Sequence, residues 1–288
     1  MRRNKTATLL LSKQFEISGL FSGRWCLLFA ILLVTHAGSG AAAESPRQQV
    51  TRIVTQIQRA DYEGDRVALL RLYDQLAPFT QEKDFGSRVR YWRGFALWRR
   101  ALNGANETVA AGELDSGLEQ AVREFREAIV LDPAFVDARI AAASCLFFRM
   151  FLNRGDSERV REFLPEALQW IKDAQAAAPE NPRLLWVQGG TYWYLPPERG
   201  GGEDKAMDAY RKGLDYAHTQ KNARQDLLNP SWGEPELLMN LSWSSLHRLK
   251  PDFGAAEQYA NDALKIIPYW HYVRDILLPQ IQAAKQKR

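Results

Sequence analysis

The feature that most constrains this chain is a spacing that recurs four times. In each copy an Ala is followed four residues later by another apolar residue, three residues after that by a small one, and usually five residues further on by Pro. The four sets are Ala121, Phe125, Ala128 and Pro133; Ala167, Ile171, Ala174 and Pro179; Ala206, Tyr210 and Gly213, with His218 where Pro would fall; and Ala256, Ala260, Ala263 and Pro268. Steps of four and three place residues on one helix face, where small side chains let a partner helix approach closely. Pro then suits the start of the next helix, which does not need its missing N–H.

A second helical segment precedes each of these helices. The four segments cover residues 87–101, 136–150, 182–194 and 237–249. Each has a small residue near its middle, namely Gly94, Ala143, Gly189 and Ser244. The sequence therefore predicts four helix pairs. Residues 47–60 and 65–77 predict a further hairpin ahead of them, and residues 269–285 predict a C-terminal capping helix interrupted at Pro279.

Over residues 87–268 the pattern resembles the tetratricopeptide repeat (TPR), which has a small residue in its first helix and A-x3-F with a later Pro in its second. The chain departs from it in two ways. Extra residues separate the two helices in the first three units, and the third unit lacks its Pro and leads into a long connection over residues 217–235. The resemblance implies an all-α, tetratricopeptide-like α-solenoid of antiparallel helix pairs with inter-helix insertions.

The first 43 residues have the features of an export signal. The apolar run over residues 25–34 is too short to span a bilayer, follows Arg24, and precedes the small residues Ala41 to Ala43. We expect cleavage near Ala43 and a single TPR-like domain over residues 44–288, in the periplasm or secreted, with no stable membrane span. The alternative is an anchor that is not cleaved.

The charge balance gives no support to a nucleic-acid partner. The chain has a net charge of +4, and residues 1–43 alone hold five basic residues against one acidic residue. The predicted mature domain therefore has no net charge, which gives no support to a surface that binds phosphate backbones.

The TPR resemblance also implies a groove lined by the first helix of each pair. The residues that it places there, and that we take as a candidate binding site, are Tyr91, Phe95, Trp98, Ile140, Phe147, Arg183, Trp186, Trp193 and Tyr194. Aromatic residues and Arg commonly anchor binding sites. Two interpretations follow: an open cleft for an apolar peptide, helix or small molecule, or core residues that the inserted segments fold back to bury.

A glycine-rich turn separates the helices of the third unit. Gly200, Gly201 and Gly202 precede a predicted helix, so their N–H groups could hold an anion, although a tight turn is the simpler interpretation. The segment over residues 194–210 resembles the helical T components of TRAP-type transporters. That resemblance implies a periplasmic partner of a transport system that handles a hydrophobic ligand.

Residues for catalysis are sparse. His271 and Asp275 are one helical turn apart, but no H-E-x-x-H motif or Cys cluster accompanies them. Cys145 lies in an apolar run typical of a buried thiol. We therefore expect no enzyme activity, no cofactor and no metal. The sequence favours an exported scaffold for a protein or peptide partner, with a hydrophobic-ligand-binding transport component as the alternative.

Overall fold

The computed structural model describes residues 44–220 and 226–287, and the predictions for the leader lie outside them. Within these ranges the chain is all-α and has no β-strand, as the sequence predicted. The α-helices are α1 (Pro46–Glu63), α2 (Arg66–Gln75), α3 (Gly86–Ala105), α4 (Ala111–Leu131), α5 (Val136–Leu152), α6 (Ser157–Ala177), α7 (Pro182–Tyr194), α8 (Glu203–Gln220), α9 (Glu234–His247), α10 (Phe253–Ile266) and α11 (Leu278–Gln286). None of these helices has the length and apolarity needed to cross a membrane.

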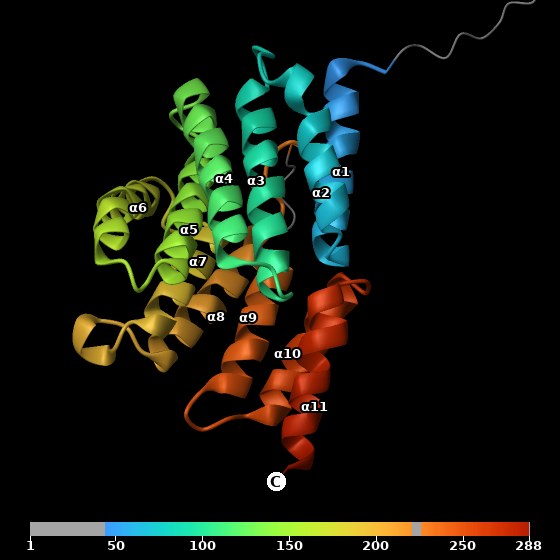
Figure 1. The fold of residues 1–288 in the computed structure, drawn as a ribbon. Helices are drawn as coiled ribbons and strands as arrows, with labels where there is room; N and C mark the ends of the chain where they lie inside the picture. The colour runs from blue at the N-terminus through green and yellow to red at the C-terminus, as the bar shows by residue number, and fades with distance from the viewer. Residues whose placement is uncertain (1–43, 221–225, 288) are drawn as a thin grey trace, which may run out of the picture. The chain divides into compact units, whose positions relative to one another are not determined.

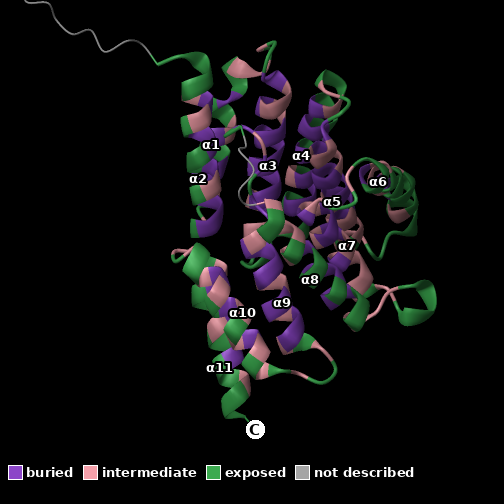
Figure 2. Cartoon of the chain, turned by 180° about the vertical axis from the view of Figure 1, so that it is seen from behind, coloured by how far each residue is buried: buried purple, intermediate pink, exposed green. Residues whose placement is uncertain are grey.

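Consecutive helices pack as hairpins. The pairs are α1 with α2, α3 with α4, α5 with α6, α7 with α8, and α9 with α10 (Figure 1). Contacts between α2 and α3, α4 and α5, α5 and α7, and α8 and α9 join each pair to the next. In Figure 2 the buried residues concentrate on α3, α5 and α9, the first helices of their pairs. This arrangement is compatible with a TPR-like stack.

Short polar residues begin several helices. The Ser45 side chain accepts a hydrogen bond from the N–H of Gln48, whose side chain bonds back to the Ser45 backbone. Asp156, Asn181 and Asp252 cap α6, α7 and α10 with their side-chain oxygens. These caps satisfy N–H groups that have no partner inside the helix, so they fix where each hairpin turns.

The predicted insertions do not form loops between the helices of the first two units. They lengthen the helices instead, so that α3 has 20 residues and α4 and α6 have 21 each. The connection predicted over residues 217–235 is also shorter, because α8 continues to Gln220. At the C-terminus, a π-helical stretch over Tyr272–Leu277 leads directly into α11, and Pro279 lies in the first turn of that helix.

Two glycines allow the helices of a pair to approach closely. A Cβ on Gly94 would lie 2.8 Å from the Phe125 ring, and one on Gly189 would lie 2.2 Å from the Tyr210 ring. Both aromatic residues come from the recurring sequence pattern, and both rings are buried. The small residue in the first helix and the aromatic residue in the second therefore form one packing unit.

The first and last helical segments of the described chain contact each other. The Tyr62 ring at the end of α1 packs edge-on against Trp270, with 5.1 Å between ring centroids. The side chain of His271 lies against Gly64, which ends α1 in the left-handed conformation at φ 74°. The helix array is therefore closed on itself by a contact between its two ends.

Candidate functional site

The candidate residues on α3 are core residues. Tyr91, Phe95 and Trp98 are at most 1% exposed. The ring of Trp232 packs against those of Phe95 and Trp98, with centroids 6.2 and 5.5 Å apart. Of the two interpretations for these residues, the structure shows the buried one. The covering segment, however, is the connection between α8 and α9 and not an insertion within a pair.

This connection, residues 226–233, will be called the inner segment. It lies against α1, α3 and α7 and is held by polar contacts from all three (Figure 1). The Trp92 indole donates to the Leu228 carbonyl at 2.8 Å, and Arg183 donates to the Trp232 carbonyl at 2.9 Å. The Trp232 indole in turn donates to the Tyr91 hydroxyl at 2.8 Å. The inner segment thus occupies the space where the TPR resemblance places a bound peptide.

Three further candidates also support this core. Ile140 is fully buried, and Trp186 is half-buried with its ring 5.6 Å from that of Trp232. Arg183 pairs with Asp137 at 2.6 Å. Arg183 and Trp186 thus hold the inner segment in place, whereas Ile140 packs in a neighbouring cluster with Leu184 and Val187.

The remaining candidates lie on a partly open surface. Phe147 and Trp193 are half-buried, and Tyr194 is 68% exposed. Trp193 and Tyr194 form a group with neighbours from α5 and α9 that will be called the aromatic stripe: Phe148, Phe151, Trp193, Tyr194 and Trp243. Phe147, which packs against the core, is not part of it. The stripe runs along the C-terminal parts of α5, α7 and α9.

Ring contacts divide the aromatic stripe into two groups, which meet where Trp193 and Tyr194 are neighbours in the chain. The Phe151 centroid lies 6.4 Å from that of Phe148 and 5.9 Å from that of Tyr194. Trp193 meets Trp243 edge-on at 5.2 Å. Because Phe151 is 46% exposed, two large rings at the Tyr194 end of the stripe face solvent. Exposed neighbouring aromatic residues commonly mark a binding surface.

Two basic side chains lie at the ends of the stripe. The Arg154 guanidinium lies 4.9 Å from the Phe151 ring centroid and donates to the Phe151 carbonyl. At the other end, the His247 ring stacks on Trp243 with centroids 4.2 Å apart. The ends of the apolar surface therefore offer hydrogen-bond donors.

The Tyr194 phenol lies within electrostatic range of two less exposed phenols, those of Tyr210 and Tyr272. Burial raises the pKa of Tyr272 to about 12, and the nearby Tyr194 phenol adds to the shift. Burial also raises the pKa of Tyr210, with Tyr194 again contributing and a hydrogen bond with Asn240 opposing it. Tyr210 and Tyr272 therefore stay protonated at neutral pH, and Tyr194 is the exposed member of the three.

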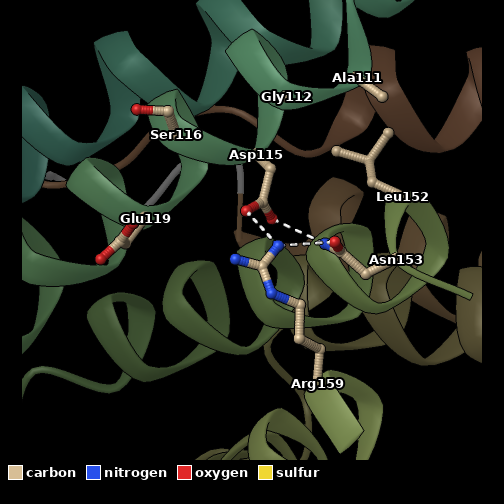
Figure 3. Close-up of a pocket in the computed structure, with 8 residues that line it drawn as sticks. All are labelled: Ala111, Gly112, Asp115, Ser116, Glu119, Leu152, Asn153 and Arg159. Carbon is tan, nitrogen blue, oxygen red and sulfur yellow. Dashed lines mark hydrogen bonds and ion pairs between the residues drawn. The ribbon is translucent and has the colours of Figure 1, made fainter. Parts of the chain in front are cut away.

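Two hollows lie elsewhere in the described chain, one lined by charged side chains and the other mainly apolar. One of about 310 Å³ lies between α4, α5 and α6, where the Asp115 carboxylate binds Asn153 and Arg159 (Figure 3). Asp115 also binds Arg149, which lies 3.9 Å from Glu119, so two carboxylates balance two guanidinium groups there. The other, of about 530 Å³, is an apolar depression on α2 beside Val67 and Leu70.

The weaker sequence features do not form sites in the described residues. The N–H groups of Gly200, Gly201 and Gly202 donate to the carbonyls of Pro197, Pro196 and Tyr192, so none of them is available to an anion. His271 bonds Asp275 at 2.8 Å, and no third metal-binding side chain joins them. Cys145 is buried, and burial raises the pKa of its thiol well above the usual range.

Three members of the stripe were not among the candidates, and one of them, Phe148, lies at a position that the TPR pattern assigns to the groove. Phe151 is four residues after Phe147 and continues its helix face beyond the positions that the TPR pattern assigns. Trp243 falls at none of those positions. The signal for Phe151 was the helical period itself, continued by one turn. For Trp243 the sequence offered none, because its place depends on how α9 packs against α7.

No family model matches the chain, and neither does any curated protein. Among solved structures it is similar to the HusA haemophore from Porphyromonas gingivalis, with a TM-score of 0.55 and 20% sequence identity. The match covers 75% of this chain and 100% of that one. At this identity the likeness shows a shared helical fold.

Proposed function

We propose that this protein is an exported helical-repeat protein that binds a flat, apolar small molecule on the aromatic stripe. It acts by binding and not by catalysis. The observation that carries the proposal is the pair Phe151 and Tyr194, two exposed rings 5.9 Å apart that continue into the half-buried stripe. Stacking on such rings favours a planar ligand.

Haem is the first ligand to test. The structurally similar protein is a haemophore, and the match covers the full length of that protein. Haem has two broad apolar faces and carboxylates at one edge. The exposed rings would contact a face, and Arg154 lies where it could pair with a carboxylate.

A scaffold for a protein partner is the competing proposal, and the stripe would then receive an apolar side of a peptide. The inner segment already fills the part of the groove beside α3, which leaves a partner only the stripe. A role beside a transporter, suggested by the resemblance to TRAP T components, is compatible with either occupant. Both proposals include export of the protein through its N-terminal signal.

The test is a titration of the mature protein, residues 44–288, with haem and with metal-free protoporphyrin, followed by tryptophan fluorescence. Trp193 and Trp243 lie in the stripe, so a porphyrin bound there should quench them. Phe151→Ser should weaken binding by about tenfold, because it removes roughly one aromatic stacking contact. Leu249→Ser is the matched control, since Leu249 is 86% exposed and is not part of the stripe.

Native mass spectrometry of protein purified from its own compartment gives the second readout. A bound small molecule that Phe151→Ser removes would support the ligand proposal. Co-purification with a polypeptide, together with no porphyrin binding, would favour the scaffold. Equal binding by wild type and Phe151→Ser would place the ligand elsewhere and contradict the assignment of the stripe.

A further inference from the structure

Tyr194, the exposed phenol at the end of α7, is a candidate iron ligand, and this role rests on the proposed function. The donor atoms that bind the ferric iron of a haem in proteins are the Tyr oxygen, the His nitrogen, and the sulfur of Cys or Met. An iron ligand for a porphyrin on the stripe must be exposed, close to the apolar rings, and not already engaged. Each candidate donor in the described chain can be compared on these three conditions.

Most of the candidates fail. Cys145 is buried, His271 bonds Asp275, and His218 pairs with Glu234 at 3.2 Å. The other nine tyrosines are buried or half-buried, and none of the described methionines is exposed. Tyr194 is 68% exposed, and its hydroxyl makes no hydrogen bond within the described residues.

His247 is the remaining rival. It is exposed and lies at the stripe, but its ring is stacked flat on Trp243 and its Nδ1 lies 2.8 Å from the Trp243 carbonyl. Only its Nε2 could reach an iron. Moreover, the exposed phenylalanine that would support the porphyrin face, Phe151, lies beside Tyr194 and not beside His247.

We propose that Tyr194 is the axial ligand of a ferric porphyrin held on the aromatic stripe. The phenol gives its proton to solvent, and the resulting phenolate oxygen donates an electron pair to a coordination position of Fe(III). The iron keeps its oxidation state, so no oxidant or reductant is needed. Phe151, at 5.9 Å from the Tyr194 ring, supplies an apolar contact beside the coordinating oxygen.

The experiment compares wild type, Tyr194→Phe and His247→Gln with two probes, ferric haem and metal-free protoporphyrin. Tyr194→Phe keeps the aromatic ring and removes only the donor oxygen. It should lower the affinity for ferric haem by about tenfold or more, leave the affinity for metal-free protoporphyrin unchanged, and abolish the phenolate-to-iron charge-transfer band. His247→Gln should keep the charge-transfer band, because the His247 ring is not the iron ligand.

Each other outcome has a defined meaning. If Tyr194→Phe binds haem with wild-type affinity and spectrum, or if His247→Gln is the variant that loses the band, the assignment of Tyr194 is overturned. If the wild type binds both porphyrins equally and shows no charge-transfer band, the stripe binds porphyrin without iron coordination, which overturns this inference and leaves the proposed function intact. If the wild type binds neither probe, both fail.

Discussion

The guanidinium of Arg99 donates to the carboxylate of Asp61 at 2.7 Å, in a fully enclosed part of the core. The same guanidinium donates to Glu236 at 3.2 Å, and Glu236 also accepts from the Tyr62 hydroxyl. One cation therefore serves two buried carboxylates from opposite ends of the described chain, Asp61 on α1 and Glu236 on α9. Burial alone would lower the pKa of Arg99, but the two carboxylates outweigh it and the net shift is upward.

Replacing Arg99 with Ala should destabilise the protein by about 3–5 kcal/mol, because it leaves two buried carboxylates without their cation. Urea unfolding followed by tryptophan fluorescence measures the loss. Arg126→Ala is the control. It removes an exposed ion pair with Glu166, which should cost at most about 1 kcal/mol. Equal losses in the two variants would show that the buried cluster contributes no more than a surface pair.

The carboxylates of Asp61 and Asp115 should make contributions to folding stability that depend on pH in opposite directions. Burial raises the pKa of Asp61, although Arg99 opposes the shift. A raised folded-state pKa means that stability is present at low pH and is lost as pH rises through that pKa. Burial also acts to raise the pKa of Asp115, but hydrogen bonds and charge from Arg149 outweigh it, and the net shift is downward. Stability from Asp115 is therefore lost as pH falls.

The measurement is the free energy of unfolding of wild type, Asp61→Asn and Asp115→Asn between about pH 3 and pH 8. The wild type should gain stability relative to Asp61→Asn as the pH falls. Asp115→Asn should be less stable than wild type at neutral pH by about 1–3 kcal/mol, and the difference should shrink in acid. Parallel curves for the three proteins would contradict both shifts.

Gly189 and Gly190 provide a matched pair on α7. A Cβ at Gly189 would meet the Tyr210 ring at 2.2 Å, so Gly189→Ala should destabilise by about 1–3 kcal/mol through overpacking. A Cβ at Gly190 would meet only the Tyr210 hydroxyl, at 3.9 Å. Gly190→Ala should therefore stabilise the helix by up to about 1 kcal/mol. Thermal unfolding distinguishes the two, and a stabilising Gly189→Ala would refute the packing unit.

The inner segment depends on Trp232. Trp232→Ala should cost about 3–5 kcal/mol, because it leaves a cavity among the rings of α3 and α7. Leu227→Ala, in the same segment but 74% exposed, should change stability by less than about 0.5 kcal/mol. Denaturant midpoints measured in parallel give both values. Similar midpoints for the two variants would mean that the segment can leave the groove at little cost.

The sequence predicted the parts of this fold that depend on local periodicity. Gly94 and Gly189 stood out as small residues on apolar helix faces, and their contacts with Phe125 and Tyr210 follow the predicted pairing. The place of Trp232 could not be predicted in this way. Its contacts with Tyr91 and Trp98 join residues more than 130 positions apart, as the 141-residue separation of the Tyr91–Trp232 hydrogen bond shows.

The candidate site was predicted only in part for the same reason. The family pattern specifies which helix faces point inward, and it places Trp193 and Tyr194 near the C-terminal end of α7. It does not specify whether another segment covers those faces. Trp98 and Trp193 occupy the same position of the TPR pattern in their helices, yet Trp98 is fully buried and Trp193 is only half-buried. The difference comes from the inner segment, which reaches α3 and stops short of the stripe.

The contact between Tyr62 and Trp270 changes how such an array can come apart. Linear repeat proteins lose their terminal units first, because an end unit has one neighbour instead of two. Here the first and last units are each other's second neighbour. Hydrogen exchange at the C-terminal end of α1 should therefore resemble that of the middle helices, and Trp270→Ala should speed exchange there. The chain must also be complete before this contact forms, so folding cannot finish unit by unit during synthesis.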